Sequence, residues 1–303
     1  MKIGLALGGG GAKGLAHISA LRVPETAHVP LDLITGTSAG AIVGALYAAG
    51  KSPDDIERLM RRLTLRQWLA LDRTGMGMFS TDGICHILQA EVGKETRIEN
   101  LPRAFACVAV DLDSQEEVVF DAGSVIDAVC ASAAFPGIFA PVRIGERFFI
   151  DGGTLNPVPF DIARQRGADC VIAVDLAAEE PLFTATDPHT PRRGGLLYRF
   201  LFTAEQQKTF RVLARTIGIM TKQLRVQKME HSPPDLVIYP QVQNVGLLDF
   251  DLIDVCLAAG ESATRDALPQ IQTLIAPSRV MPLRRTWRKT LAQIARQIAI
   301  HAR

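Results

Sequence analysis

The sequence lacks several features that define common classes of protein. It has no run of about 18 uninterrupted apolar residues, so it predicts no transmembrane helix. Its five cysteines are widely spaced and form no C-x-x-C motif, which argues against a zinc site and a disulfide framework and favours reduced, buried thiols. A net charge of +1 does not suggest nucleic acid as a partner. The sequence contains no internal repeats and no low-complexity tracts.

The beginning of the sequence has only part of the pattern of a secretory signal. Lys2 and a short apolar stretch resemble its first two regions, but the glycines at 8–11 and Lys13 interrupt the stretch too early. We therefore expect a cytoplasmic protein, with peripheral contact to the inner membrane face left open.

Acidic residues are missing from one end of the sequence. From Gln270 to Arg303 there is no Asp or Glu, but there are seven Arg or Lys residues. Within 284–303 an apolar stripe recurs at helical spacing, formed by Trp287, Leu291, Ile294 and Ile298. A basic amphipathic helix of this kind can lie in a lipid interface. It can equally pack on its own domain or on a second subunit, so membrane contact and homo-oligomer formation both stay open.

Short apolar runs bounded by glycine or turn residues predict buried strands. Such runs occur at 3–7, 31–36 and 170–176. Helical patterns lie between the first two and after the second, as expected for parallel strands with helical connections. Paired strands are predicted at 103–112 and 116–120, and a hairpin at 142–153, turning at Gly145. We expect an α/β fold with a mainly parallel sheet sandwiched between helices over residues 1–275, followed by the amphipathic helix within 276–303.

The first run is followed at once by the glycine-rich segment 8–14. Gly9, Gly11 and Gly14 satisfy G-x-G-x-x-G, which is typical of a dinucleotide-binding loop. That interpretation expects an acid about 20 residues further on, and the nearby Asp32 stands at the start of the second strand instead. Consecutive glycines at a helix N-terminus can also direct backbone N–H groups at an oxyanion. The motif alone leaves nucleotide, oxyanion and purely structural roles open.

The segment G-T-S-A-G follows the second strand and precedes a helix. Its form is that of a nucleophile elbow, in which Gly36 and Gly40 leave room for a sharp turn that exposes Ser38. Small-residue turns also occur without catalysis. The order strand, turn, helix favours the catalytic interpretation.

A serine nucleophile needs a base. We expect each histidine to have a structural role or to lie on the surface, and none to be catalytic. The histidines are His17, His28, His86, His189, His231 and His301. Asp151 ends an apolar strand and is followed by Gly152 and Gly153. A carboxylate held there can accept a proton from a serine hydroxyl, or can form only an Asx-turn with the following amides.

Together, "GLALGGGGAKGLAHI", "GTSAGAIVGALYAAG", "SAAFPGIFAPV" and "DGGTLNPVP" resemble the patatin-like phospholipases, especially their small bacterial members. The resemblance implies a Ser–Asp dyad with Ser38 as nucleophile and Asp151 as base. It also implies an oxyanion hole formed by Gly10 and Gly11, and a loop-steadying or anion-attracting role for Lys13. The remaining motif positions are Gly9, Gly14, Gly36, Gly40, Gly152 and Gly153.

The activity implied is hydrolysis of lipid carboxylic esters through an acyl-enzyme, of phospholipase A or lysophospholipase type, without metal or cofactor. A carboxylesterase or thioesterase acting on soluble acyl groups is the alternative within enzymes. The non-enzymatic alternative is a nucleotide-binding module, which predicts that Ser38 and Asp151 lie far apart. Two departures from the family pattern bear on substrate preference: Gly8, and Pro24, which is expected to interrupt the helix after the glycine loop.

Overall fold

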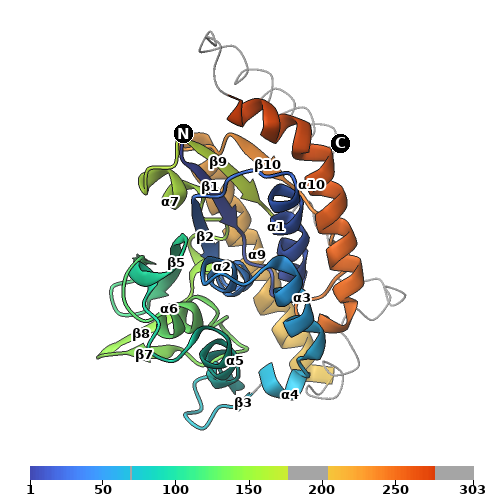
Figure 1. The fold of residues 1–303 in the computed structure, drawn as a ribbon. Coiled ribbons are helices and arrows are strands. Elements are labelled where there is room, and N and C mark those ends of the chain that lie inside the picture. Colours follow the sequence, from blue (N-terminus) through green and yellow to red (C-terminus); the bar gives the residue numbers. More distant parts are fainter. Residues whose placement is uncertain (69, 177–203, 277–303) are drawn as a thin grey trace.

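A computed structural model describes residues 1–68, 70–176 and 204–276 of the protein (Figure 1). The amphipathic segment 284–303 predicted above lies outside these residues, as do His189 and His301.

The described strands belong to one large sheet and one small ladder. In chain order they are β1 (Ile3–Leu7), β2 (Leu33–Thr37), β3 (Ala70–Leu71), β4 (Phe79–Ser80), β5 (Ala104–Asp111), β6 (Glu117–Phe120), β7 (Val142–Ile144), β8 (Arg147–Asp151), β9 (Cys170–Val174) and β10 (Leu236–Ile238).

The helices alternate with the strands in the first part of the chain. The α-helices are α1 (Ala16–Thr26), α2 (Ala39–Ala48), α3 (Pro53–Arg62), α4 (Leu65–Trp68), α5 (Asp82–Val92), α6 (Val125–Ser132), α7 (Phe160–Gln165), α9 (Ala204–His231) and α10 (Ile253–Ile275). The described residues also form four short 3-10 helices, η1 (Gly11–Leu15), η2 (Ile98–Asn100), η3 (Gly152–Thr154) and η4 (Phe250–Leu252).

The large sheet is mostly parallel, as predicted. Its order is β10-β9-β1-β2-β5-β8-β7, with β6 also paired to β5. The strands from β10 to β5 are parallel to their neighbours, whereas β6, β7 and β8 join through antiparallel pairs. The carboxyl ends of β1, β2 and β9 therefore meet at one edge, where parallel α/β sheets place their ligand sites.

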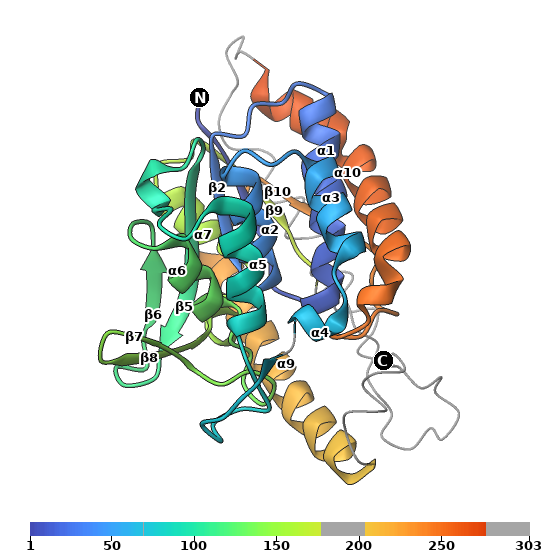
Figure 2. The ribbon, with the colours of Figure 1, turned by 60° about the horizontal axis from the view of Figure 1, so that its bottom comes forward.

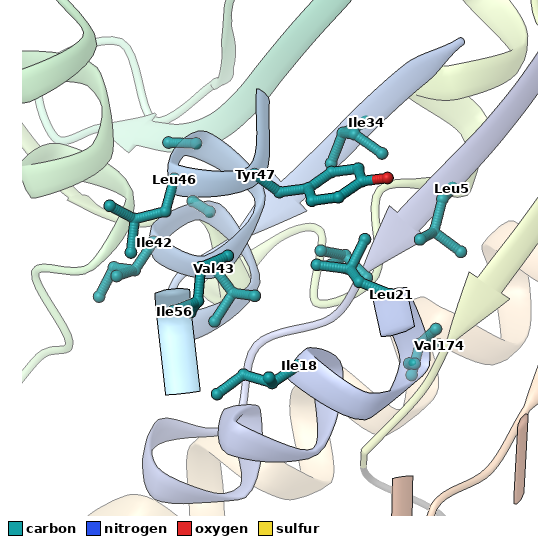
Figure 3. Close-up of a cluster of buried hydrophobic side chains, with 14 of the residues drawn as sticks. Leu5, Ile18, Leu21, Ile34, Ile42, Val43, Leu46, Tyr47, Ile56 and Val174 are labelled. Carbon is teal, nitrogen blue, oxygen red and sulfur yellow. The ribbon is translucent and has the colours of Figure 1, made fainter. Parts of the chain in front are cut away.

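Alternate residues of β1 face opposite layers of helices, as the two-residue period of a strand requires. Leu5 and Leu7 pack with α1, α2 and α10, and this core also contains Ile34, Leu46 and Val174 (Figure 3). Ala6 packs on the other face with Phe160 and Ala163 of α7. The two clusters confirm a sheet with helices on both faces.

Three local features differ from the sequence-based expectation. Helix α1 continues through Pro24 to Thr26, so Pro24 does not end it. Cys85 and Cys130 are joined as a disulfide between α5 and α6, although their spacing gave no indication of it, while the other three cysteines are free and buried. The β3–β4 ladder lies in a segment for which no strands were predicted. No helix among the described residues has the length and apolar character needed to cross a membrane.

Candidate active site

Ser38 occupies the sharp turn between β2 and α2. Its backbone has φ 55° and ψ −121°, a conformation that is costly for a residue with a side chain. The turn is possible because its neighbours are small: a Cβ on Gly40 would lie 2.1 Å from the carbonyl oxygen of Leu7. A Cβ on Gly36 would lie 2.5 Å from the carbonyl oxygen of Gly40. The geometry is that of the predicted nucleophile elbow.

Two hydrogen bonds fix this turn to segments that are remote in sequence. The Ser38 N–H donates to the Oγ of the buried Ser132, at the end of α6, at 2.9 Å. The hydroxyl of Thr37 donates to the carbonyl oxygen of Asn156 at 2.9 Å. The elbow is thus tied both to α6 and to the loop that follows Asp151.

Asp151 ends β8 and is 1% exposed. Its backbone N–H donates to the carbonyl of Ala134, and its Oδ1 accepts the Gly153 N–H at 2.7 Å. Burial raises the pKa of Asp151 to about 6, although the Ser38 hydroxyl and the Gly153 N–H both favour its charged form. The other carboxylate oxygen, Oδ2, has no hydrogen-bond partner among the described residues. A carboxylate so placed is more basic than an exposed one.

The glycine loop lies directly beside this pair. A Cβ on Gly9 would lie 3.3 Å from the Cβ of Ser38. A Cβ on Gly14 would lie 2.4 Å from that of Ala39, so η1 packs closely against the start of α2. Gly11 has φ +57°, and a Cβ there would meet the carbonyl oxygen of Leu247 at 2.4 Å. Close packing on both sides explains why this loop consists of glycines.

The backbone N–H groups of the loop divide into two sets. Those of Gly8 and Gly9 donate to the carbonyls of Val174 and Pro157, and that of Ala12 donates to Leu247. Gly10 and Gly11 lie between these residues in the sequence, and their N–H groups have no acceptor among the residues that the structure describes. Two adjacent unbonded donors beside a serine can stabilise an oxyanion.

His17, the second residue of α1, supports the glycine loop with a hydrogen bond. Its side chain is fully buried, and its Nε2 lies 2.7 Å from the carbonyl oxygen of Gly8. Burial lowers the pKa of His17 to about 4, although the bond to Gly8 opposes this shift. The ring is therefore neutral at pH 7 and donates from Nε2, since a carbonyl can only accept.

Lys13 lies on η1 and is 9% exposed. Burial raises the pKa of the neighbouring Cys256 of α10 to about 11, and the charge of Lys13 partly opposes this increase. Lys13, within the glycine-rich segment, thus lies near α10, a position suited to steadying the loop.

The loop after Asp151 is fixed by charged groups. A Cβ on Gly152 would lie 2.1 Å from the carbonyl oxygen of Val108, so this loop also packs closely on its neighbours. Asn156 is fully buried, and its Nδ2 donates to Glu117 at 3.1 Å and to Asp161 at 2.8 Å. Lys228 of α9 donates to the same two carboxylates, at 2.9 and 2.6 Å. Helix α9 thereby contributes to a site that lies more than 70 residues away in sequence.

An apolar cluster flanks the site between the glycine loop and the end of α6. Its buried members are Phe79, Ile138 and Leu248, and its partly exposed members are Met78, Phe135, Phe139, Leu247 and Phe250. Leu247 contacts Gly11, and Phe135 follows Ala134, whose carbonyl accepts the Asp151 N–H. The cluster offers an apolar surface next to the glycine loop.

Sequence reasoning located the segments that meet here but missed their supports. Ser132 and Asn156 lie within family segments quoted above, but the resemblance assigned neither of them a role, and Lys228 lies in no motif. Their partners lie 94, 119 and 111 residues away. Of the remaining described histidines, His28 and His86 are exposed, and His231 bonds to the Gln227 carbonyl at the end of α9. The described residues contain no group of His, Cys, Asp and Glu side chains that could hold a metal ion.

Comparison with known proteins agrees with this geometry. Residues 5–164 match the family model of the patatin-like phospholipases. The chain belongs to this family. Over 288 residues it is 31% identical to an NTE family protein of Mycobacterium bovis, covering 88% of this chain and 46% of that protein. It is 34% identical over 186 residues to the mouse patatin-like phospholipase domain-containing protein 6, covering 59% of this chain and 14% of that protein.

The chain thus spans less than half the length of either relative. Among solved structures, VipD of Legionella pneumophila is similar with a TM-score of 0.51 at 14% identity. That alignment covers 89% of this chain and 66% of VipD, and supports the shared fold.

Proposed function

We propose that this protein is a serine acyl hydrolase that cleaves carboxylic esters of lipids, of phospholipase A or lysophospholipase type. The observation that carries the proposal is the contact of the Ser38 hydroxyl with the buried Asp151 carboxyl, beside the unbonded N–H groups of Gly10 and Gly11. Family membership supports it. A nucleotide-binding module predicts Ser38 and Asp151 far apart, and their contact argues against that alternative.

The reaction follows from the positions of these groups. Ser38 Oγ attacks the ester carbonyl while Asp151 accepts the hydroxyl proton. The negative charge that develops on the carbonyl oxygen is stabilised by the N–H groups of Gly10 and Gly11. Asp151 then gives its proton to the leaving alcohol, which departs and leaves an acyl-Ser38. A water molecule, deprotonated by Asp151, attacks this ester and releases the fatty acid and free Ser38.

The apolar cluster around Phe79 favours a lipid acyl chain over a small acid. Its partly exposed phenylalanine, leucine and methionine side chains lie against the glycine loop and the segment before Asp151. Burying an acyl chain there gains roughly 0.8 kcal/mol for each CH₂. A soluble carboxylesterase or thioesterase remains the competing activity, and substrate tests separate the two.

The decisive experiment is covalent labelling of the nucleophile. Ser38→Ala should abolish labelling by a fluorophosphonate and hydrolysis of lysophosphatidylcholine, because it removes the hydroxyl that forms the acyl-enzyme. Ser19→Ala is the matched control: Ser19 is also buried, lies on α1, and its hydroxyl has no partner among the described residues. It should label like the wild type.

Persistent labelling of folded Ser38→Ala protein would reject this nucleophile. Hydrolysis of short soluble esters without any activity on lysophosphatidylcholine or phospholipid vesicles would instead favour the soluble-substrate alternative.

A further inference from the structure

Exposed large apolar side chains gather at one end of the described molecule. Of the ten in the described chain, six lie on just two elements. Four belong to α9 and two to the β3–β4 segment; they are Val212, Leu213, Ile219, Met220, Leu71 and Met76. We call these six residues the apolar rim. In both ribbon views α9 and β3 reach the same end of the molecule (Figures 1 and 2).

The four rim residues on α9 lie on one face of the helix. At 100° per residue, positions 212, 213, 219 and 220 fall within about 120° of the helix circumference. Val212 is 68% exposed and Met220 is 60% exposed. The N-terminal half of α9 runs out beyond the body of the protein (Figure 2, yellow). An amphipathic helix normally buries such a face.

The other end of α9 is anchored beside the active site. Arg225 is buried and donates to Asp175, which directly follows β9, at 2.7 Å. Lys228 bonds to Glu117 and Asp161 next to the Asp151 loop. The helix therefore leads from the site outward, and about 20 Å separate Arg225 from Val212 at a rise of 1.5 Å per residue.

The β3–β4 segment carries a second, ordered part of the rim. The Asp72 carboxylate accepts the backbone N–H groups of Thr74, Met76 and Gly77, which fixes the connection between the two strands. Leu71 is 77% exposed and Met76 is 51% exposed. At its base, Phe79 is buried in the apolar cluster that flanks the site, so this segment joins the rim to that cluster.

The charge around the rim indicates what covers it. Lys222, two residues after Met220 on α9, is exposed. Arg73, beside Leu71, is exposed as well. Large apolar side chains bordered by cations fit the surface of a bilayer that contains anionic lipid.

We propose that the apolar rim docks on an anionic lipid surface and turns the mouth of the Ser38 site toward it. The inference rests on the proposed lipid substrate. The apolar side chains enter the acyl boundary, while Arg73 and Lys222 meet headgroup phosphates. A lipid then reaches the apolar cluster without crossing water.

The test is binding of Ser38→Ala protein to vesicles by co-sedimentation, so the result does not depend on catalysis. Vesicles of phosphatidylcholine alone are compared with vesicles that also contain phosphatidylglycerol, at low and high salt. Adding Ile219→Asp and Met220→Asp together should lower partitioning onto the anionic vesicles about tenfold or more, because two charges would enter the interface. Met76→Asp should lower it several-fold.

Val255→Asp is the matched control for Val212→Asp, since both valines are exposed on helices and receive the same substitution. The control should bind like its parent, whereas Val212→Asp should bind several-fold more weakly. Circular dichroism and thermal unfolding verify the fold of each variant.

Three results would overturn the proposal. Unchanged binding by the Ile219/Met220 variant would exclude the rim. Loss of binding only on Leu291→Asp with Ile294→Asp would assign the membrane contact to 284–303. A wild-type dimer that the rim variant converts to a monomer without vesicle binding would identify a second copy as the occupant.

Discussion

Two loops meet at Ser38, and they are held in opposite ways. The glycine loop is fixed by neutral hydrogen bonds, with backbone carbonyls accepting the N–H groups of Gly8 and Gly9 and with His17 donating to Gly8. The loop after Asp151 is fixed through Asn156 by the charged groups Glu117, Asp161 and Lys228. Because these supports carry no charge, the electrostatic field in the loop comes mainly from the dipoles of the unbonded N–H groups of Gly10 and Gly11. Such a field stabilises an oxyanion.

The buried titratable group of each loop extends the contrast. Asp151 has a raised pKa, so the folded protein binds its proton more tightly than the unfolded chain does. His17 has a lowered pKa, so the folded protein binds its proton less tightly. Between about pH 6.5 and 4, falling pH therefore stabilises the fold through Asp151 and destabilises it through His17. Each contribution is on the order of 3 kcal/mol, and the two nearly offset each other.

The largest expected effect is that of Asp151→Asn. Loss of the general base should lower kcat by about 10² to 10⁴. The same change should raise the free energy of unfolding at pH 8 by roughly 1 to 3 kcal/mol, because a buried carboxylate is removed. The gain should vanish near pH 4, where the wild-type carboxyl is protonated. Urea unfolding at the two pH values, together with ester turnover, checks both parts.

For the wild type, kcat/KM should rise with pH through an apparent pKa of about 6, since only the carboxylate can accept the Ser38 proton. Full activity of Asp151→Asn, or a stability that does not differ from the wild type at any pH, would contradict this assignment.

Substitution of His17 should have an intermediate effect. His17→Leu leaves the Gly8 carbonyl without its donor, so kcat should fall by roughly tenfold to a hundredfold with little change in KM, as expected for a group that positions oxyanion donors. His17→Gln keeps an N–H donor and should recover much of this loss. Equal kcat in all three proteins would show that the loop does not need the bond.

The pH dependence of His17→Gln separates positioning from general destabilisation. Relative to the wild type, this variant should become more stable as pH falls from 6.5 to 4, by about 3 kcal/mol, because it has no buried imidazole to protonate. Urea unfolding over this range measures the difference. An unchanged difference between pH 7 and pH 4 would mean that His17 titrates normally in the folded protein.

The two loops also differ in how far the sequence predicts them. The glycine loop and the elbow follow from local rules, because a strand, small residues and a helix succeed one another within a few positions. Asp151 was placed at a strand end for the same reason. The roles of Asn156, Ser132 and Lys228 depend on contacts between remote segments. Asn156 and Ser132 lie within segments that resemble the family, but the resemblance did not give either of them a supporting role.

The smallest effect is expected for Lys228→Met, at the outer end of the charged support. Burial disfavours the ammonium, but its hydrogen bonds to Asp161 and Glu117 outweigh this and raise the pKa of Lys228 above its usual value. Without the cation, two carboxylates would share the Asn156 amide. Because the lysine side chain is 26% exposed, water would screen much of the repulsion. We expect a loss of about 1 to 2 kcal/mol in the free energy of unfolding and a few-fold lower kcat.

Lys228→Arg, which keeps the charge, is the control and should retain stability and turnover close to the wild type. Added salt should narrow the stability difference between Lys228→Met and the wild type, since it screens the charges that hold this loop. The stability difference between His17→Leu and the wild type should not change with salt, because the His17 contact is neutral and fully buried. Equal salt dependence of the two variants would show that the supports of the two loops do not differ in kind, and the charged one would then act through packing of the lysine stem rather than through its ammonium.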